Sequence, residues 1–186
     1  MIKRRNKKIK YNEQVYIKNN YVVNGKAVIP VLLEDVNDLF MKHDYKRKEL
    51  SHDVSTYIEE IANMIPISMD IVIEFHCPEI SEEEKEKYTN CVRNNYGMEI
   101  DDTDYEIAKI NFKSIIYGTI GLAILIINLL TEKYIGEVLS NFICVVWWVA
   151  IWEMVELLTI EKSRLKWERL NYQQLYDSEI TFVFDK

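Results

Sequence analysis

The sequence predicts an α+β domain joined to a two-helix transmembrane hairpin. Three observations predict this fold class: two long uncharged apolar segments, a short connection between them, and strand-like patterns on both sides of the pair. Overall, the 186 residues look like an ordinary soluble protein, with 48% hydrophobic residues and a net charge of -7, but the apolar residues are segregated. This segregation excludes an ordinary cytosolic domain and a disordered chain, and a content of 5 Gly and 3 Pro excludes a collagen-like chain.

The two apolar segments give the strongest signal. Ser114–Leu130 and Val138–Trp152 hold no charged side chain. We predict spans at 112–131 and 138–160, each close to the ~20 residues that cross ~30 Å of hydrocarbon as a helix. The six residues Glu132–Glu137 between them predict an antiparallel hairpin. A hairpin buried inside a soluble protein is the alternative.

Basic residues near the spans predict the orientation. The connection holds Lys133 alone, whereas the outer flanks hold seven basic residues, so both termini are expected in the cytoplasm. The basic N-terminus is not a secretory signal, because Tyr11–Gln14 follows it in place of an apolar region. The seven flanking residues are Arg93, Lys109, Lys113, Lys162, Arg164, Lys166 and Arg169.

The segment ahead of the hairpin begins with strand-like patterns. Gln14–Ile17 and Tyr21–Val23 alternate between apolar and polar residues, and Asn24-Gly25 is a two-residue turn signal ahead of a strand at 27–33. We expect a short helix at Val36–Met41.

Longer helices and a second strand follow. Ser51 is expected to begin a helix that runs to about Ile65, before Pro66, and Met69–Phe75 is the clearest strand. Ser81 and Glu84 form a capping box for a helix that we expect to end at Gly97, with a left-handed cap. Asp101–Asp104 is expected to cap another helix, which continues into the first span.

The residues after the second span predict a helix at 161–175 and a terminal strand at Glu179–Phe184. A lone strand is unstable in water, so this strand is expected to pair with the N-terminal sheet. The chain is then divided into a basic arm (1–10), a cytoplasmic α+β domain (11–105), a helix leading into the hairpin (106–160), and a returning helix and strand (161–186).

In each predicted span, a set of residues spaced by three or four positions lies along one helix face. Ser114, Gly118 and Gly121 let another helix approach closely. One interpretation packs large indoles into this groove; in the other, several hairpins assemble and Asn128, Asn141 and the glutamates line a polar path. The two faces consist of Ser114, Gly118, Gly121, Leu125, Asn128 and Thr131, and of Asn141, Cys144, Trp148, Trp152, Glu156 and Thr159.

The glutamates of the second span need partners, because a buried carboxylate in lipid is costly. Counting back equally from the connection places Lys113 level with Glu153 and Glu156. We predict an ion pair or a group of snorkelling side chains there; the alternative is that both carboxylates reach interfacial water.

The first ten residues hold six basic residues and no acidic one. This arm is expected to be solvated and to help fix the topology, or to contact anionic lipid. The acidic remainder of the chain argues against nucleic acid. The lipid-contact candidates are Lys3, Arg4, Arg5, Lys7 and Lys8.

No catalytic or phosphate-binding motif is recognisable in the chain, and no cofactor is expected. His76 and Cys77, with the later Cys91, are candidate metal ligands, but no paired C-x-x-C spacing supports them. His43 and His52 are interpreted as surface residues.

The stretch Trp148–Leu158, with the basic helix and strand that follow it, resembles an uncharacterised family of bacterial two-span membrane proteins with a cytoplasmic α+β domain. The helix from Leu50 to Ile58 ahead of an apolar strand fits the same pattern, and the resemblance extends from about Asp38 to Phe184. It implies the architecture and the bacterial cytoplasmic membrane as the location, and it implies no known reaction.

We therefore expect a non-enzymatic interaction protein. It would anchor a small cytoplasmic domain at the lipid bilayer and dock an unknown protein partner, or act as an accessory subunit. The alternative is a self-assembling membrane effector or channel, a homo-oligomer gated through its cytoplasmic domain. A membrane enzyme with an unrecognised site is a third hypothesis.

Overall fold

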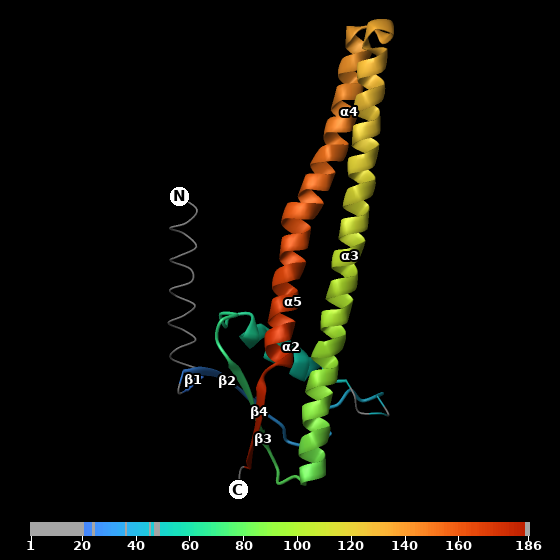
Figure 1. Cartoon of the computed structure of the whole chain (residues 1–186). Coiled ribbons are helices and arrows are strands. Elements are labelled where there is room, and N and C mark those ends of the chain that lie inside the picture. The colour runs from blue at the N-terminus through green and yellow to red at the C-terminus, as the bar shows by residue number, and fades with distance from the viewer. Residues whose placement is uncertain (1–20, 24, 36, 45, 47–48, 185–186) are drawn as a thin grey trace. The chain divides into compact units, whose positions relative to one another are not determined.

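The computed structural model describes residues 21–23, 25–35, 37–44, 46 and 49–184 (Figure 1). Its contacts divide the chain into two units. Residues up to Ile100 form the first unit together with those from Leu170 onward, and Asp101–Arg169 forms the second. The predicted strand at Gln14–Ile17 lies outside the described residues.

The first unit is built on a mixed four-stranded sheet with the strand order β1-β2-β3-β4. β1 and β2 are antiparallel, whereas β3 is parallel to β2 and β4 is parallel to β3. Gly25 in the β1–β2 turn has φ 85°, a conformation open to glycine, so the glycine of the predicted turn is confirmed; Asn24 is outside the described residues. The strands are Val22–Val23, Lys26–Leu32, Ile71–Cys77 and Glu179–Phe184.

The last strand joins the sheet far from its neighbours in sequence. β4 pairs in parallel with β3, so that Ile180 lies beside Ile73 and Phe182 beside Phe75. The predicted pairing of this strand with the N-terminal sheet is confirmed. It gives the two phenylalanine rings a stacked contact with centroids 5.8 Å apart.

The core of this unit lies against one face of the sheet. Alternate residues of β2 and β3 are buried there. Tyr88 of helix α3 (Glu82–Ile135) places its ring edge-on to Phe75, with centroids 6.0 Å apart. Helix α2 (His52–Ala62) adds Ile58 and Ile61. The largest fully buried side chains are Tyr88, Tyr96, Phe75, Ile29, Leu39, Ile58, Ile73 and Leu175.

Two predicted helix starts are confirmed. Ser51 immediately precedes α2, although its side chain makes no capping hydrogen bond. At the start of α3, the Ser81 backbone N–H donates to Glu84 Oε2 (2.8 Å) and the Glu84 N–H donates to Ser81 Oγ (3.3 Å), as a capping box requires.

The short helix predicted at Val36–Met41 is wrong for the described residues 37–41. They form turns, and Phe40 forms an isolated bridge with Leu50. The reason is local: the Asn37 N–H donates to Asp35 Oδ1 and the Asp35 N–H donates to Asp38 Oδ2. Such side-chain acceptors compete with helical hydrogen bonds and favour turns.

Helix α3 (Glu82–Ile135) continues through both breaks that the sequence predicted. Gly97 is not a left-handed cap, and Asp101–Asp104 lies inside the helix. A Cβ at Gly97 would lie 3.5 Å from the ring of Tyr176, an ordinary contact distance, so this position lies against the ring within the first unit. The predicted continuity into the first apolar segment is confirmed.

The second unit is a pair of helices joined by one residue. The last part of α3 ends at Ile135, and α4 (Glu137–Glu156) begins after Gly136, which has φ 79°. The predicted six-residue connection is therefore too long, because both helices extend into it. α4 continues through the π-helix η1 (Leu157–Glu161) into α5 (Lys162–Tyr176), where the Lys162 N–H bonds to Leu157 O.

Candidate functional site

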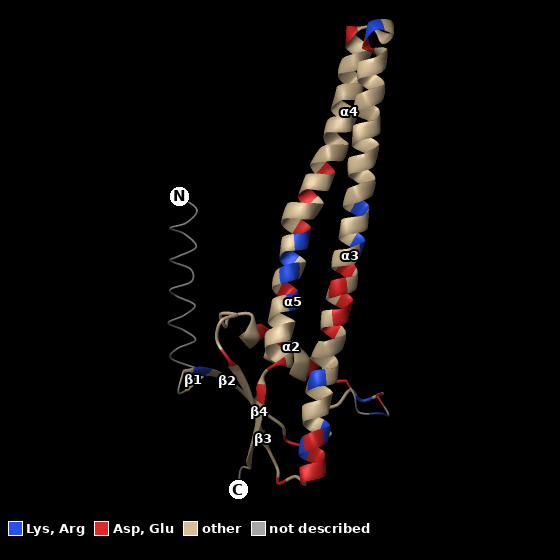
Figure 2. Cartoon of the chain, viewed as in Figure 1, with Lys and Arg blue, Asp and Glu red and all other residues tan. Residues whose placement is uncertain are grey.

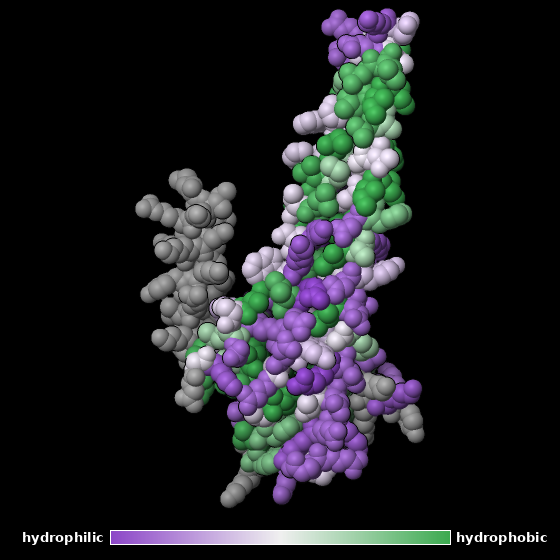
Figure 3. Space-filling view, viewed as in Figure 1, coloured by the Kyte–Doolittle hydropathy of each residue, from purple (hydrophilic) through white to green (hydrophobic). Residues whose placement is uncertain are grey.

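The apolar helix pair of the second unit is the candidate functional site, because its apolar side chains point outward. α3 and the helix from Glu137 to Tyr176 are both long and apolar enough to cross a membrane, judged by length and composition. Only 17% and 6% of their most apolar stretches are buried. Figure 3 shows the resulting hydrophobic surface along the hairpin. The core helix of a soluble protein would be mostly buried instead.

Contacts between the two helices fix their register. Gly118 lies opposite Met154 and Gly121 opposite Ile151, whereas Asn111 bonds to Lys162. The paired residue numbers add to 272 in the first two cases and to 273 in the third. This shift of one matches the extra residue that a π-helical turn inserts between them. In this register, the predicted spans at 112–131 and 138–160 lie side by side.

The glycines permit a close approach of the two helices. A Cβ at Gly121 would lie 3.0 Å from Ile151 Cδ1 and 3.3 Å from Ala150 Cβ. At Gly118 it would lie 2.7 Å from the Met154 sulfur. Packing into this groove is thus confirmed, but by Ala150, Ile151 and Met154 and not by the indoles of Trp148 and Trp152.

The predicted indole packing at Trp148 and Trp152 is wrong, because these side chains are 58% and 60% exposed. The residues of that α4 face do lie along one side, but apart from Cys144, which accepts a hydrogen bond from Asn128, they point away from α3. Asn141, Glu156 and Thr159 lie on the same outer side and are also exposed. The inner face could have been recognised from the smaller residues Ser140 and Ala150, which suit a close helix contact.

Asn128 lies at the centre of a small polar cluster between the helices. Its side chain is 4% exposed; Nδ2 donates to Cys144 Sγ at 3.2 Å, and Oδ1 accepts from Ser140 Oγ at 3.2 Å. Asn128 is one of the two asparagines proposed to line a polar path, and its side-chain amide finds hydrogen-bond partners within its own hairpin. Such a buried polar contact fixes the register of two helices.

The three charges predicted to cluster do not contact one another. In the register above, Lys113 lies level with Thr159, about one turn from the predicted position beside Glu153 and Glu156. The prediction centred the hairpin at Tyr134, whereas the connection is Gly136. Across the described part of the chain, no ion pair or side-chain hydrogen bond involves Lys113, Glu153 or Glu156, so the predicted ion pair is not present.

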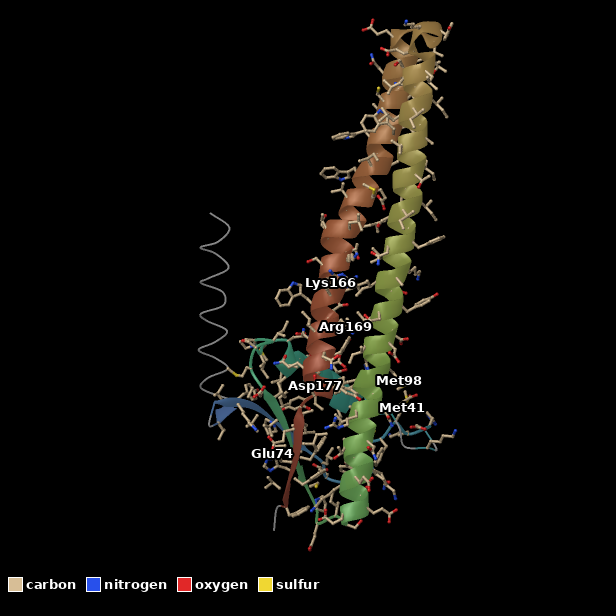
Figure 4. The ribbon with its side chains drawn as sticks, in the orientation of Figure 1. Met41, Glu74, Met98, Lys166, Arg169 and Asp177 are labelled. Atoms are coloured by element: carbon tan, nitrogen blue, oxygen red, sulfur yellow. The ribbon has the colours of Figure 1, made fainter. Side chains whose placement is uncertain are left out.

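Charged side chains gather below the apolar part of the hairpin (Figure 2). Arg169 Nε donates to Asp104 Oδ1 at 2.6 Å, and Arg164 pairs with Glu161 and Glu168. Lys166 and Arg169 both come from α5 (Figure 4). Asp104 raises the pKa of the Arg169 guanidinium through a hydrogen bond. This end of the hairpin is polar, and the connected end holds the charged residues Glu132, Lys133 and Glu137, so the apolar surface has two polar limits.

The first unit offers no metal cluster among the described residues. Cys77 and Cys91 are buried, and burial raises the pKa of the Cys91 thiol to about 12, which disfavours the thiolate that binds metal. His76 Nε2 instead lies 2.9 Å from Glu74 Oε1 of the same strand. Figure 4 shows Glu74 on β3. The lipid-contact candidates Lys3, Arg4, Arg5, Lys7 and Lys8 lie outside the described residues.

Comparisons with protein-family models, curated proteins and solved structures find no match for this chain. The resemblance to the bacterial two-span family stays a prediction. Function therefore has to be argued from the hairpin and from the domain itself.

Proposed function

We propose that this chain is an integral membrane protein whose hairpin anchors a small cytoplasmic α+β interaction domain, as a non-enzymatic scaffold or accessory subunit. The observation that carries the proposal is the outward-facing apolar surface of two helices whose apolar segments lie at the same level. Residues 112–131 as a helix extend about 30 Å, the thickness of the hydrocarbon core. Lipid is the solvent that suits such a surface.

The polar limits of the hairpin support the orientation. Lys133 is the one basic residue of the connection, whereas Lys109, Lys113 and four basic residues of α5 lie at the other end. The positive-inside rule favours the cytoplasm for that other end. The first unit is joined to it at both Ile100 and Leu170, so it would lie in the cytoplasm as well.

The sheet supports a role in docking. β4 lies at the edge of the described sheet, with β3 on one side only. An edge strand presents unpaired backbone groups that can accept a strand from another protein. An accessory subunit or scaffold needs a surface of this kind, and it needs no catalytic constellation.

Cysteine labelling tests both anchoring and orientation. Tyr134→Cys places a thiol in the connection, where the native side chain is 87% exposed, and Ser163→Cys places one at the other end. In intact spheroplasts, a membrane-impermeant maleimide should label Tyr134→Cys alone, and Ser163→Cys should react only after the membrane is opened. The unsubstituted protein is the blank, because Cys77 and Cys91 are buried and Cys144 lies within the second apolar segment.

Two results would contradict the proposal. If alkaline carbonate releases the chain from membranes, the hairpin does not span them. If Ser163→Cys reacts in intact cells and Tyr134→Cys does not, the orientation is reversed.

The exposed outer side of α4 favours the second function, a self-assembling effector or channel. Asn141 and Glu156 are exposed there, and a polar side chain facing lipid is costly unless protein or water covers it. Proteoliposomes loaded with a self-quenched dye would test this function. A channel or effector releases the dye, and a scaffold retains it.

A further inference from the structure

Lys113 and Glu156 are opposite charges without partners near one end of the apolar surface. Neither side chain has an ion pair or a side-chain hydrogen bond within the described residues, and both are exposed. Nearby, Lys109 is paired with Glu106 and Arg164 with Glu161. Glu153, one turn deeper than Glu156, has no ion pair within the described residues either, but it lies farther from the level of Lys113. Unpaired charges at the edge of lipid are unfavourable, so these two call for a partner outside their own hairpin.

Their directions prevent them from meeting within one chain. Glu156 follows Met154, which packs against Gly118, by two residues; at about 100° per residue it points away from α3. Lys113 precedes Ser114, which is buried between the helices, so it points to the flank of the pair. The two side chains therefore point in different directions and do not meet within one hairpin.

Their depths, in contrast, agree. Lys113 is level with Thr159, which is three residues, or about 4.5 Å along the helix axis, from Glu156. A lysine side chain bends over such a distance when it snorkels. Two copies inserted in the same orientation would thus present Lys113 and Glu156 to each other at nearly the same height.

We propose that the hairpin self-associates with a second copy of this chain around a two-fold axis along the membrane normal, with Lys113 of each copy paired to Glu156 of the other. The inference rests on the proposed function, because the membrane aligns the two copies. A two-fold interface makes both ion pairs at once and yields a four-helix bundle. The surface chemistry favours this partner: residues 112–131 of α3 hold Lys113 as their only charged side chain, so it is the charge that Glu156 of a second copy can meet at this depth.

Charge exchange between chains tests the proposal. Lys113→Glu and Glu156→Lys are each expected to lose dimerisation, because every interface then brings like charges together. A mixture of tagged Lys113→Glu and untagged Glu156→Lys restores both pairs, since the first chain supplies two carboxylates and the second two ammonium groups. The tag should therefore retain the untagged chain at least tenfold more from the mixture than when tagged and untagged copies of one variant are combined.

The measurements are co-purification from lipid nanodiscs and native mass spectrometry of the unsubstituted protein, which should give a dimer. Charge reversal at the connected end, Lys133→Glu or Glu137→Lys, is the matched control and should leave the dimer intact. The double variant Lys113→Glu/Glu156→Lys should also dimerise, which shows that the substituted hairpin folds. A monomer in nanodiscs, or a mixture that co-purifies no better than the single variants, would overturn the proposal.

Membrane flotation separates this failure from failure of the proposed function. A protein that floats with vesicles but stays monomeric is anchored and does not pair in this way. A protein that does not float has no hairpin in the membrane, and both proposals then fail.

Discussion

The phenol of Tyr96 allows the packing of the first unit to be tested with one atom. The residue is 0% exposed, its ring stacks on Tyr172 with centroids 6.4 Å apart, and its hydroxyl has no hydrogen-bond partner among the described residues. Burial, with Glu59 nearby, raises the pKa of this phenol well above its ordinary value. A buried hydroxyl without a partner costs about 1–3 kcal/mol.

Tyr96→Phe removes the hydroxyl and keeps the ring. We expect it to raise the free energy of unfolding by about 1 kcal/mol, the lower end of that range, because a small space remains where the oxygen was. For a chain of this size, such a gain raises the midpoint of thermal unfolding by about 2–4 °C. Near-ultraviolet circular dichroism in mild detergent measures the midpoint.

Ser81→Ala provides the control. It removes one side of the capping box at the start of α3 and should lower the stability by about 1 kcal/mol. If Tyr96→Phe lowers the midpoint as much as Ser81→Ala does, the hydroxyl stabilises the fold and the reasoning from its missing partner is refuted.

Two further predictions concern the helix groove and an acidic residue. Gly121→Ala should destabilise the hairpin, because overpacking against Ile151 and Ala150 costs about 1–3 kcal/mol and exceeds the helix-propensity gain of about 1 kcal/mol. Gly118→Ala should be neutral, because the Met154 side chain can move. Equal melting midpoints for the two variants in detergent would count against the register. Burial, and then the charge of Glu99, raises the pKa of the Glu59 carboxyl above its ordinary value of 4.5, with His52 opposing. The ionised carboxylate therefore lowers the stability of the fold once the pH has risen from 4.5 through the raised pKa. The penalty is absent at a pH below both pKa values. Glu59→Gln should therefore raise the unfolding midpoint at pH 7 more than at pH 4, and an equal change at both values would contradict this assignment.

Long-range requirements were predicted from the sequence more successfully than local boundaries. The terminal strand was placed in the sheet because a lone strand is unstable, and β4 does pair with β3. The pair of long apolar helices follows from two long stretches without charged residues, a pattern that extends over many positions. Both inferences used properties that do not depend on one or two residues.

The errors came from signals one or two residues long. Gly97 and Asp101–Asp104 have the chemistry of helix ends. Buried Thr103 within the second of these segments and buried Ile110 beyond it nevertheless lie at helical spacing, and tertiary packing decides. At Trp148 and Trp152, periodicity identified a face but could not tell inside from outside, because a helix that is apolar enough to cross a membrane carries large apolar side chains on its outer side as well. The two-residue difference between Tyr134 and Gly136 as the centre of the hairpin displaced the predicted level of Lys113 by a full helical turn.

The order of synthesis gives the parallel pairing of β4 with β3 a consequence for biogenesis. The ribosome makes β3 before either helix of the hairpin, and β4 after both. Until Glu179–Phe184 emerges, β3 keeps one edge unpaired, and Phe75 lacks the ring of Phe182 that later stacks on it. A nascent chain therefore carries an open strand edge, a known site of aggregation, throughout the synthesis of the hairpin, and the sheet becomes complete only after the second helix has been made.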